Sequence, residues 1–283
     1  GSLTMPDGLT YTGAWKADQI NGLGKLTQSN GDVYEGLLVE GERHGAGKVT
    51  FANGDIYEGA FVHDQRQGKG TFRGADGYFY EGDWVAGRIQ GIGRVSYPDG
   101  SVYEGQFADD LADGAGKITY PDGSTYEGDW VAGIIEGTGT AQYASGLVYK
   151  GAWKDALFDG QGTMTYSDGY TYTGSWEKGL RAGAGKAVYA DGTVYEGNFV
   201  AGQREGLGKM TMPDGFSYDG EWLAGEFHGK GVATYANGDV YEGMFAGGKR
   251  QGEGTVRFAD GTVESGTWAN NVRTSKGATG SAE

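Results

Sequence analysis

Apolar and polar residues alternate along most of this chain, and glycine interrupts the alternation at regular intervals. The stretch VYEGQFADDLADGAGKITYPDG at 102–123 is followed by TYEGDWVAGIIEGTGTAQYASG at 125–146, which changes many residues but keeps the aromatics and glycines in place. Residues that alternate share one face of a β-strand, whereas a helix would place its apolar residues three and four apart. The pattern therefore predicts strands along the whole chain.

Tyrosine sets the period of the pattern. It recurs every 23 residues, at 11, 34, 57, 80, 103, 126, 149, 172, 195, 218 and 241. Counting each of these tyrosines as position 0, glycine occupies +2, +11 and +13, and an aromatic residue occupies +4 in every unit except at Leu38. An Asp-Gly or Asn-Gly pair stands at +19/+20 in nearly every unit, with Ser145-Gly146 as the variant. A constant period of this length is typical of a repeat architecture.

Each unit is predicted to be a β-hairpin that turns near +7, and the Asp-Gly pair is predicted to turn the chain into the next unit. If the hairpin is centred near +7.5, position 0 faces +15, +2 faces +13 and +4 faces +11, so that Gly114 would lie beneath Phe107. Glutamate at +1 then faces a basic residue at +14, a pairing that antiparallel strands favour. The predicted pairs are Glu35–Lys48, Glu81–Arg94, Glu104–Lys117 and Glu196–Lys209.

The glycines indicate how such a sheet covers itself. Glycine inside a strand packs nothing, so its repeated use at +2, +11 and +13 indicates that another group approaches closely there. Large aromatic rings lying over these glycines would bury one face. The predicted fold class is all-β, an elongated single-layer antiparallel β-meander of 23-residue hairpin repeats. About 22 strands at ~4.8 Å would give a ribbon on the order of 105 Å long.

The pattern YEGxWxxGxxxGxGxxxxxDGxx, seen with one departure each at 126–148 and 195–217, resembles the MORN repeat (membrane occupation and recognition nexus). The resemblance covers the chain from Leu3 to about Asn271. It implies an elongated all-β array with a scaffold role, self-association and protein partners, and phospholipid binding has been proposed for the family. Some members carry a lipid kinase or methyltransferase domain, and no such domain is recognised in this sequence.

The repeats also suggest how the chain is divided. The pattern starts in mid-repeat at Leu3, so upstream sequence is expected to be missing. The predicted divisions are a cloning remnant at 1–2, a partial repeat at 3–10, eleven tandem repeats at 11–263, a partial terminal repeat at 264–272 and a flexible tail at 273–283.

Composition excludes several classes of protein. The 283 residues include 58 glycines but only four prolines, and glycine does not recur every third residue, which excludes collagen. Aromatic residues make up 13% of the chain and recur regularly, which argues against disorder. The net charge of −15 argues against nucleic acid as a partner. The absence of cysteine excludes disulfides and thiolate metal sites.

Candidate catalytic chemistry is better explained by the repeat. The glutamates at +1 recur once per unit, as a ladder would, and the Gly-x-Gly pairs lack the Lys-Ser/Thr and helix of a phosphate loop. His44 and His228 share position +10 but lie eight units apart, and with His63 they are interpreted as surface residues. We therefore predict no enzyme activity, no cofactor and no metal site.

The residues near the +7 turn vary most and are the candidates for binding. Arginines recur on this edge, and they would contact the headgroups of phospholipids if the protein binds membranes: Arg43, Arg66, Arg181, Arg204 and Arg250. An apolar set lies between them: Leu111, Ile134, Ile135, Leu157 and Phe158. This set either forms an exposed partner interface or folds back over the aromatic face of the sheet, and the sequence leaves both open.

The leading functional hypothesis is a non-enzymatic scaffold that binds proteins and forms a homodimer, and the alternative is a module that binds phosphoinositide headgroups. The twelfth unit has Glu264 instead of tyrosine and Ser275 instead of glycine, so its strand is expected to lack a partner in its own chain. A second copy would then pair with it and bury Trp268 and Val272. The compartment is not determined, although the cytoplasm, the cytoskeleton or a membrane surface is favoured.

Overall fold

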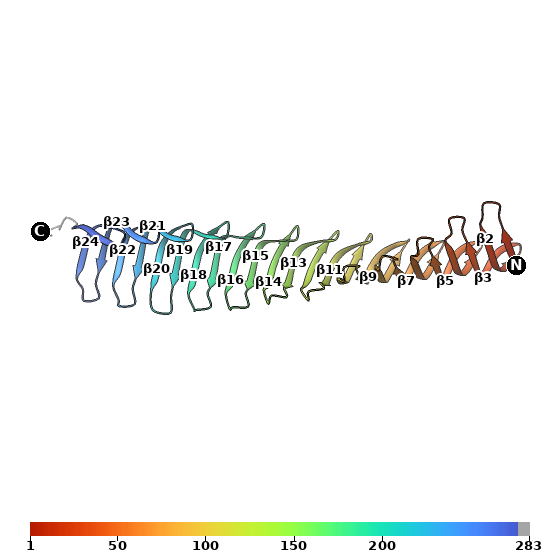
Figure 1. Ribbon diagram of the computed structural model, residues 1–283, viewed down its shortest axis with the longest axis horizontal. Coiled ribbons are helices and arrows are strands. Elements are labelled where there is room, and N and C mark those ends of the chain that lie inside the picture. Colours follow the sequence, from red (N-terminus) through yellow and green to blue (C-terminus); the bar gives the residue numbers. More distant parts are fainter. Residues whose placement is uncertain (277–283) are drawn as a thin grey trace. The chain divides into compact units, whose positions relative to one another are not determined.

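The computed structural model describes residues 1–276, which form strands and turns without any helix. The chain divides into two units, Gly1–Ala144 and Ser145–Glu283. Within each unit the strands follow one another in chain order as antiparallel hairpins (Figure 1). None of the described residues belongs to a helix with the length and apolarity needed to cross a bilayer.

The first unit contains the strands β1 (Ser2–Thr4), β2 (Thr10–Lys16), β3 (Gln19–Thr27), β4 (Val33–Val39), β5 (Glu42–Thr50), β6 (Ile56–Val62), β7 (Gln65–Arg73), β8 (Phe79–Val85), β9 (Arg88–Ser96), β10 (Val102–Ala108), β11 (Leu111–Thr119), β12 (Thr125–Val131) and β13 (Ile134–Gln142). The second unit contains β14 (Val148–Lys154), β15 (Leu157–Thr165), β16 (Thr171–Glu177), β17 (Leu180–Val188), β18 (Val194–Val200), β19 (Gln203–Thr211), β20 (Ser217–Leu223), β21 (Glu226–Thr234), β22 (Val240–Ala246), β23 (Lys249–Arg257), β24 (Val263–Ala269) and β25 (Val272–Lys276). The prediction of an all-β antiparallel meander is confirmed within each unit.

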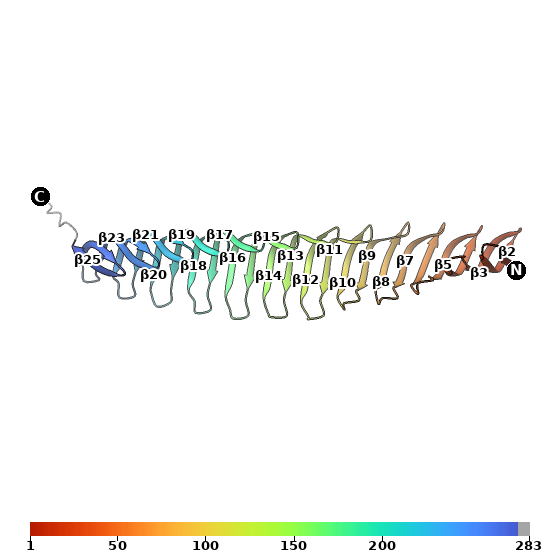
Figure 2. The same ribbon diagram turned by 45° about the horizontal axis from the view of Figure 1, so that its top comes forward.

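Two kinds of connection alternate along the chain. The short one is a two-residue turn at +6/+7, as at Glu40 and Gly41, where both residues have positive φ. This is the twist that a tight hairpin requires. The longer one contains the Asp-Gly pair, and Figure 2 shows these connections along one side of each unit. There only the glycine has positive φ, and Asp99 Oδ1 accepts the backbone N–H of Ser101 at 2.8 Å. The Asp-Gly pairs therefore do turn the chain, but not with positive φ at both residues.

The predicted register is correct near the tyrosine and wrong near the turn. In β10 and β11, Tyr103 faces Ile118, Glu104 faces Lys117 and Gly105 faces Gly116. A bulge follows, so Phe107 at +4 faces Ala112 at +9 instead of Gly114. Gly114, with a φ of +95°, belongs to this bulge and lies opposite Trp130 of the next repeat. The +11 glycine is therefore required by its backbone conformation, which other residues rarely adopt.

The core of each unit is the row of repeat tyrosines. Tyr103 is 1% exposed and lies over the paired glycines Gly105 and Gly116. A Cβ added to Gly116 would come within 2.1 Å of the Tyr103 hydroxyl oxygen and 2.4 Å of Cζ. The predicted hollow therefore exists at +2 and +13, where the ring of the same repeat fills it. This explains why a single sheet without a second layer still buries large aromatic side chains.

The C-terminal end differs from the prediction. β24 pairs with β25, and Ala269 faces Val272 while Trp268 faces Arg273. The twelfth unit therefore has a hairpin partner in its own chain, and the prediction of a lone strand is wrong. The predicted flexible tail at 273–283 is also wrong for 273–276, which belong to β25, and 277–283 lie outside the described residues. At the other end, Leu3 of β1 faces Tyr11 of β2.

Candidate functional site

One face of each unit, here called the tyrosine face, carries the repeat tyrosines. Most of these rings are held between two aromatic rings at +4, one from their own repeat and one from the next, whereas Leu38 takes one of these places beside Tyr11 and Tyr34. The Tyr103 centroid lies 5.1 Å from that of Phe107 and 5.2 Å from that of Trp130, both in edge-to-face geometry. The Tyr103 hydroxyl donates to the Gln106 carbonyl at 2.9 Å, and Trp130 Nε1 donates to the Gly116 carbonyl at 3.2 Å. The polar groups of these buried rings are thus satisfied by the backbone.

Position +9 lies directly above this aromatic row, and the arginines predicted to bind headgroups all occupy it. The Arg66 guanidinium lies 4.2 Å from the centroid of the Trp84 ring and 5.6 Å from that of Tyr57, and its Nη2 donates to the Gly87 carbonyl at 2.7 Å. Gly87 belongs to the short turn of the following hairpin. The arginine therefore covers a ring and fastens one hairpin to the turn of the next.

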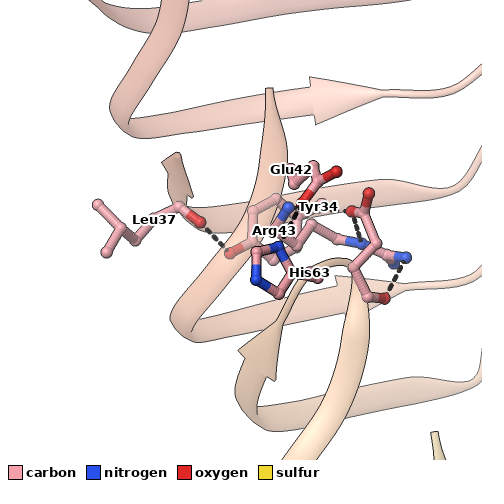
Figure 3. Close-up of polar contacts among 6 residues, drawn as sticks. Tyr34, Leu37, Glu42, Arg43 and His63 are labelled. Atoms are coloured by element: carbon pink, nitrogen blue, oxygen red, sulfur yellow. Dashed lines mark hydrogen bonds and ion pairs between the residues drawn. The ribbon is translucent and has the colours of Figure 1, made fainter. Parts of the chain in front are cut away.

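Three of the other four arginines have the same arrangement. Arg43 donates from Nη2 to the Asp64 carbonyl at 2.8 Å and from Nε to Asp64 Oδ1 at 2.9 Å (Figure 3). Arg181 and Arg204 donate to the carbonyls of Gly202 and Gly225. In these three arginines and in Arg66 the guanidinium is directed at rings and backbone instead of at solvent.

Arg250 completes the set and adds one feature. Its guanidinium lies 4.3 Å from the Trp268 centroid, and Nη2 donates to the Asn271 carbonyl at 2.9 Å. Its Nε is buried without a hydrogen-bond partner among the described residues. A hollow of about 700 Å³ adjoins this arginine on the tyrosine face, with Val256 and Phe258 among the residues that line it. The hollow is apolar apart from the arginine and nearby turn residues.

The apolar set predicted near the turn divides into two groups. Leu111 and Ile134 of the first unit are 48% and 49% exposed, and Leu157 of the second unit is 46% exposed. These three occupy position +8. Ile135 and Phe158 occupy +9 and are half-buried, and Phe158 stacks on Tyr149 with centroids 4.0 Å apart. The interpretation that the set folds back over the aromatic face is thus correct for position +9. The residues at +8 are exposed, and a partner interface there stays a prediction.

The structure adds neighbours that the sequence pattern did not single out. Leu180 also occupies +8, in the second unit, and is 52% exposed. In the first unit, Val131 faces Ile134 across the short turn and is 54% exposed, and Val85 is 47% exposed. The sequence could have predicted the exposed valines, because +5 is valine in most repeats of the first unit.

The two residues proposed for self-association differ in exposure. Trp268 is 6% exposed and is covered within its own chain by Tyr241 and Arg250. It needs no second copy to bury it. Val272 is 65% exposed on β25, the last strand that the structure describes.

The charged ladder on the opposite face has ion pairs that join neighbouring repeats. Lys25 Nζ lies 3.2 Å from Glu35 Oε1, and Arg94 Nε lies 2.9 Å from Glu104 Oε1. The basic residue at +14 thus pairs with the glutamate of the following repeat, although it also faces that of its own repeat across the hairpin. These side chains are about half exposed, and such pairs contribute little to stability.

A histidine pair also emerges, because His63 and His44 lie in adjacent hairpins. Their ring centroids are 5.8 Å apart. His63 Nδ1 lies 2.7 Å from Glu42 Oε2 (Figure 3). The spacing argument compared His44 only with His228 and so did not find this contact. Among residues 1–276, no group of three or more histidine or acidic residues is placed to hold a metal ion.

Three comparisons relate the chain to known proteins. No curated protein was found to match it. Solved structures that resemble it include the TCP10 domain of Danio rerio CPAP, with 15% identity, coverage of 70% of this chain and 94% of that chain, and a TM-score of 0.40. Another is the SAS-4 (dCPAP) TCP domain of Drosophila melanogaster in complex with a proline-rich motif of Ana2, with 13% identity, coverage of 71% and 90%, and a TM-score of 0.33.

The family model gives a direct assignment. The MORN repeat model matches eleven consecutive segments between residues 11 and 263: 11–33, 34–56, 57–77, 80–102, 103–125, 126–148, 149–169, 172–194, 195–217, 218–240 and 241–263. All eleven begin at a repeat tyrosine, and nine of them span one full unit of 23 residues. The chain belongs to the MORN repeat family.

Proposed function

We propose that the protein is a non-enzymatic scaffold that binds protein partners and associates with itself. The observation that carries the proposal is an exposed apolar row on the first unit, which consists of Val62, Val85, Leu111, Val131 and Ile134. Each of these side chains is at least 40% exposed. Exposed apolar surface that continues over several repeats is typical of a protein interface.

The proposal of a protein interface is supported by the way the row is built. Each side chain stands at +5 or +8, on the strand residues that flank the short turns, and successive turns lie side by side. A Cβ on Gly133 would lie 3.8 Å from Leu111 Cδ2, which places Leu111 beside the next turn and near Ile134. The row is therefore continuous between these two repeats and not a set of isolated side chains.

The lipid alternative loses its main support. The arginines that would bind headgroups already contact aromatic rings and backbone carbonyls, and moving a guanidinium to a phosphate would uncover the ring beneath it. The net charge of −15 opposes an anionic surface, where each basic residue contributes only about 1 kcal/mol. We therefore do not propose membrane binding as the function.

Light scattering of the intact chain at tens of micromolar tests the self-association part. We expect a mass above that of one chain, and a lower mass when Leu111→Asp and Ile134→Asp are combined. Ile92→Asp is the matched control, because Ile92 is 55% exposed on the same unit but lies outside the row. An intact chain that is monomeric would contradict self-association.

The same measurement distinguishes the C-terminal end from the apolar row. If β25 is the contact between copies, Val272→Asp lowers the mass and the Leu111/Ile134 variant does not. Trp268 is not a useful position for this test, since its substitution would disturb the packing around Tyr241.

A further inference from the structure

We infer that the tyrosine row of the first unit, which consists of Tyr97, Tyr120 and Tyr143, binds a proline-rich segment with basic residues in an extended polyproline II conformation. The inference rests on the proposed function, because it names one class of protein partner for the scaffold. The row lies beside the core on the tyrosine face, at position +17 of three consecutive repeats.

The tyrosines form a periodic surface of separate rings. Tyr120 and Tyr143 are each 38% exposed, and Tyr97 is half-buried. The residues that stand between them in the sheet are small: Ser101 and Ser124 are 2% and 8% exposed. The surface here is therefore made of tyrosine rings that cover the serines. Within residues 1–276, these three rings make no ring-to-ring contact with one another.

The serines between the tyrosines project little beyond the rings, because their side chains are short and buried. Ser124 Oγ accepts the backbone N–H of Ala144 at 3.0 Å, which ties two neighbouring long turns together. The residue equivalent to Ala144 one repeat earlier is Pro121, which has no N–H, and Ser101 Oγ is buried without a hydrogen-bond partner among the described residues. The row is thus built from compact side chains that project little beyond the rings.

One position of the second unit shows the opposite arrangement. There Tyr170 stands where Ser101 and Ser124 stand in the first unit. Its ring centroid lies 5.2 Å from that of Tyr166 and 5.1 Å from that of Tyr189, so three rings form a continuous cluster. Arg181 Nη1 also donates to the Tyr170 hydroxyl. The separation of Tyr97, Tyr120 and Tyr143 from one another therefore depends on Ser101 and Ser124 between them. At the end of the row, Tyr78 occupies the serine position, and its ring centroid lies 6.1 Å from that of Tyr97.

The spacing of the rings matches one backbone conformation. Two strands per repeat place equivalent residues about 9.6 Å apart. A polyproline II helix rises about 3.1 Å per residue with three residues per turn, so every third residue recurs after about 9.3 Å on the same side. Over the two intervals between three tyrosines the mismatch is only about 0.6 Å. An α-helix or a β-strand has no such match to this spacing.

The chemistry of the row suits such a segment. Prolines pack well on aromatic rings, and a polyproline II helix is already ordered before binding, which lowers the entropy lost. Its carbonyls are not used internally, and no partner within residues 1–276 is found for the hydroxyls of Tyr97, Tyr120 and Tyr143. These hydroxyls can therefore donate to the carbonyls of the bound segment.

The charges select a basic segment. Burial raises the pKa of Tyr120, and the neighbouring carboxylates of Asp99 and Asp122 raise it further. Burial and Asp99 also raise the pKa of Tyr97. The two carboxylates border the row, so arginine or lysine beside the prolines would gain a favourable contact.

Fluorescence anisotropy with a labelled peptide tests the inference. The peptide has about ten residues, with proline at every third position and two arginines at one end. The comparison peptides are a shuffled sequence of the same composition and a version with glutamate instead of arginine. We expect saturable binding of the first peptide and at least about tenfold weaker binding of the other two. Equal binding of the shuffled peptide would overturn the inference.

Variants locate the site. Combining Tyr120→Ala with Tyr143→Ala should weaken binding at least about tenfold, because two ring surfaces are removed. Tyr120→Phe keeps the ring and should lose less peptide affinity than the double variant. Ile92→Ala is the control, since Ile92 faces Gln106 on the opposite side of the sheet. Unchanged binding by the double variant would contradict the inference. If circular dichroism shows that the double variant is unfolded, the site is located instead from the amide chemical-shift changes that the peptide causes in the unaltered protein. Changes confined to residues away from the row would contradict the inference.

The outcome separates this inference from the proposed scaffold function. If the peptide does not bind but light scattering still shows self-association, only the proline-rich partner is excluded. If the peptide binds and the chain is monomeric, the inference stands and self-association is excluded.

Discussion

The first unit contains two regions that cover the repeat tyrosines in different ways. In β4–β7, position +9 is Arg43 and then Arg66, and each guanidinium lies over an aromatic ring while donating to the next turn. In the hairpins that follow, the same position is Ile89, Ala112 and Ile135. The tyrosines beneath are buried to the same degree, since Tyr57 and Tyr80 are both 0% exposed. Covering the ring is thus the shared requirement.

The second unit makes the comparison sharper, because neighbouring repeats there use phenylalanine and arginine. Phe227 stacks on Tyr218 with centroids 4.0 Å apart, whereas Arg204 lies 5.6 Å from the Tyr195 centroid and 4.5 Å from that of Trp222. A planar group fits in both cases. Only arginine also donates a hydrogen bond to the following turn, here the Gly225 carbonyl at 2.8 Å. The two coverings should therefore respond differently to ionisation and to truncation.

Alkaline pH should produce the largest effect. Burial raises the pKa of Tyr195 to about 12, and the charge of Arg204 partly opposes this, whereas burial and Asp159 both raise the pKa of Tyr149, also to about 12. A folded pKa above the unfolded value of about 10 means that the neutral form is favoured by folding. The stabilisation is complete below pH 10 and is lost as pH rises toward 12. We expect unfolding in that range, measured by tyrosinate absorbance and circular dichroism.

The tyrosines covered by arginine and those covered by phenylalanine should differ in how their pKa responds to truncation of the covering residue. Removing the positive charge with Arg204→Ala should raise the pKa of Tyr195 further, while Phe227→Ala should not raise the pKa of Tyr218 through charge. Titration of individual tyrosines by NMR would show the difference. Tyrosines that all ionise at their ordinary pKa in the folded protein would contradict the burial on which both coverings depend.

Filling the hollow beneath the ring should destabilise both kinds of repeat equally. Gly116→Val would place a branched side chain beneath Tyr103, in a repeat whose tyrosine is covered by an apolar residue. Gly70→Val would do the same beneath Tyr57, in a repeat whose tyrosine is covered by arginine. Overpacking of this kind costs about 1–3 kcal/mol in free energy of unfolding. Gly123→Asn is the control, because nothing lies within 4 Å of its Cβ and asparagine tolerates a φ of +87°. Chemical denaturation measures the effect, and an unchanged midpoint for Gly116→Val would show that the hollow is not needed.

Truncating the arginine should have a smaller effect. Arg204→Ala removes a cation–π contact and a hydrogen bond from a charged donor, which together contribute about 1–2 kcal/mol at a half-buried site. Arg204→Phe should recover much of the loss, because the ring can take the position that Phe227 occupies in the next repeat. Denaturant titration of both variants tests this. If Arg204→Phe is as unstable as Arg204→Ala, ring coverage is not the requirement shared by the two coverings.

The sequence was sufficient for the repeat fold because the tyrosine and glycine positions are strictly periodic. It predicted the pairing of Tyr103 with Ile118 and Gly105 with Gly116, but not the bulge that follows. Glycine at +11 is compatible both with a hollow and with positive φ, and the sequence does not distinguish a steric from a conformational need. Gly114 has positive φ, so the register beyond Gly105 shifted.

The role of the arginines was missed for a related reason. Position +9 is Arg204 in one repeat and Phe227 in the next, and a position that accepts both a guanidinium and a phenyl ring is more typical of ring coverage than of a solvent edge. That comparison could have been made from the sequence. The contact between Arg204 and the Gly225 carbonyl could not, because it depends on how closely the following turn approaches.

Binding to lipid should show the smallest effect. Because Arg181 and Arg204 are held on rings and on the carbonyls of Gly202 and Gly225, we expect only weak sedimentation with phosphoinositide vesicles, which fades by physiological salt as screening shortens to about 8 Å. Arg181→Glu with Arg204→Glu should lower the melting temperature more than it changes lipid binding.

Lys209→Glu with Lys230→Glu makes the same change of charge at exposed positions and is the control for the vesicle experiment. If the weak binding is nonspecific attraction between charges, both double variants should reduce it by the same amount. Tight binding at high salt that the arginine variant abolishes and the lysine variant keeps would contradict this expectation. It would mean that the arginines leave their rings for a headgroup, and that the arginine-covered repeats differ from the apolar ones in function as well as in packing.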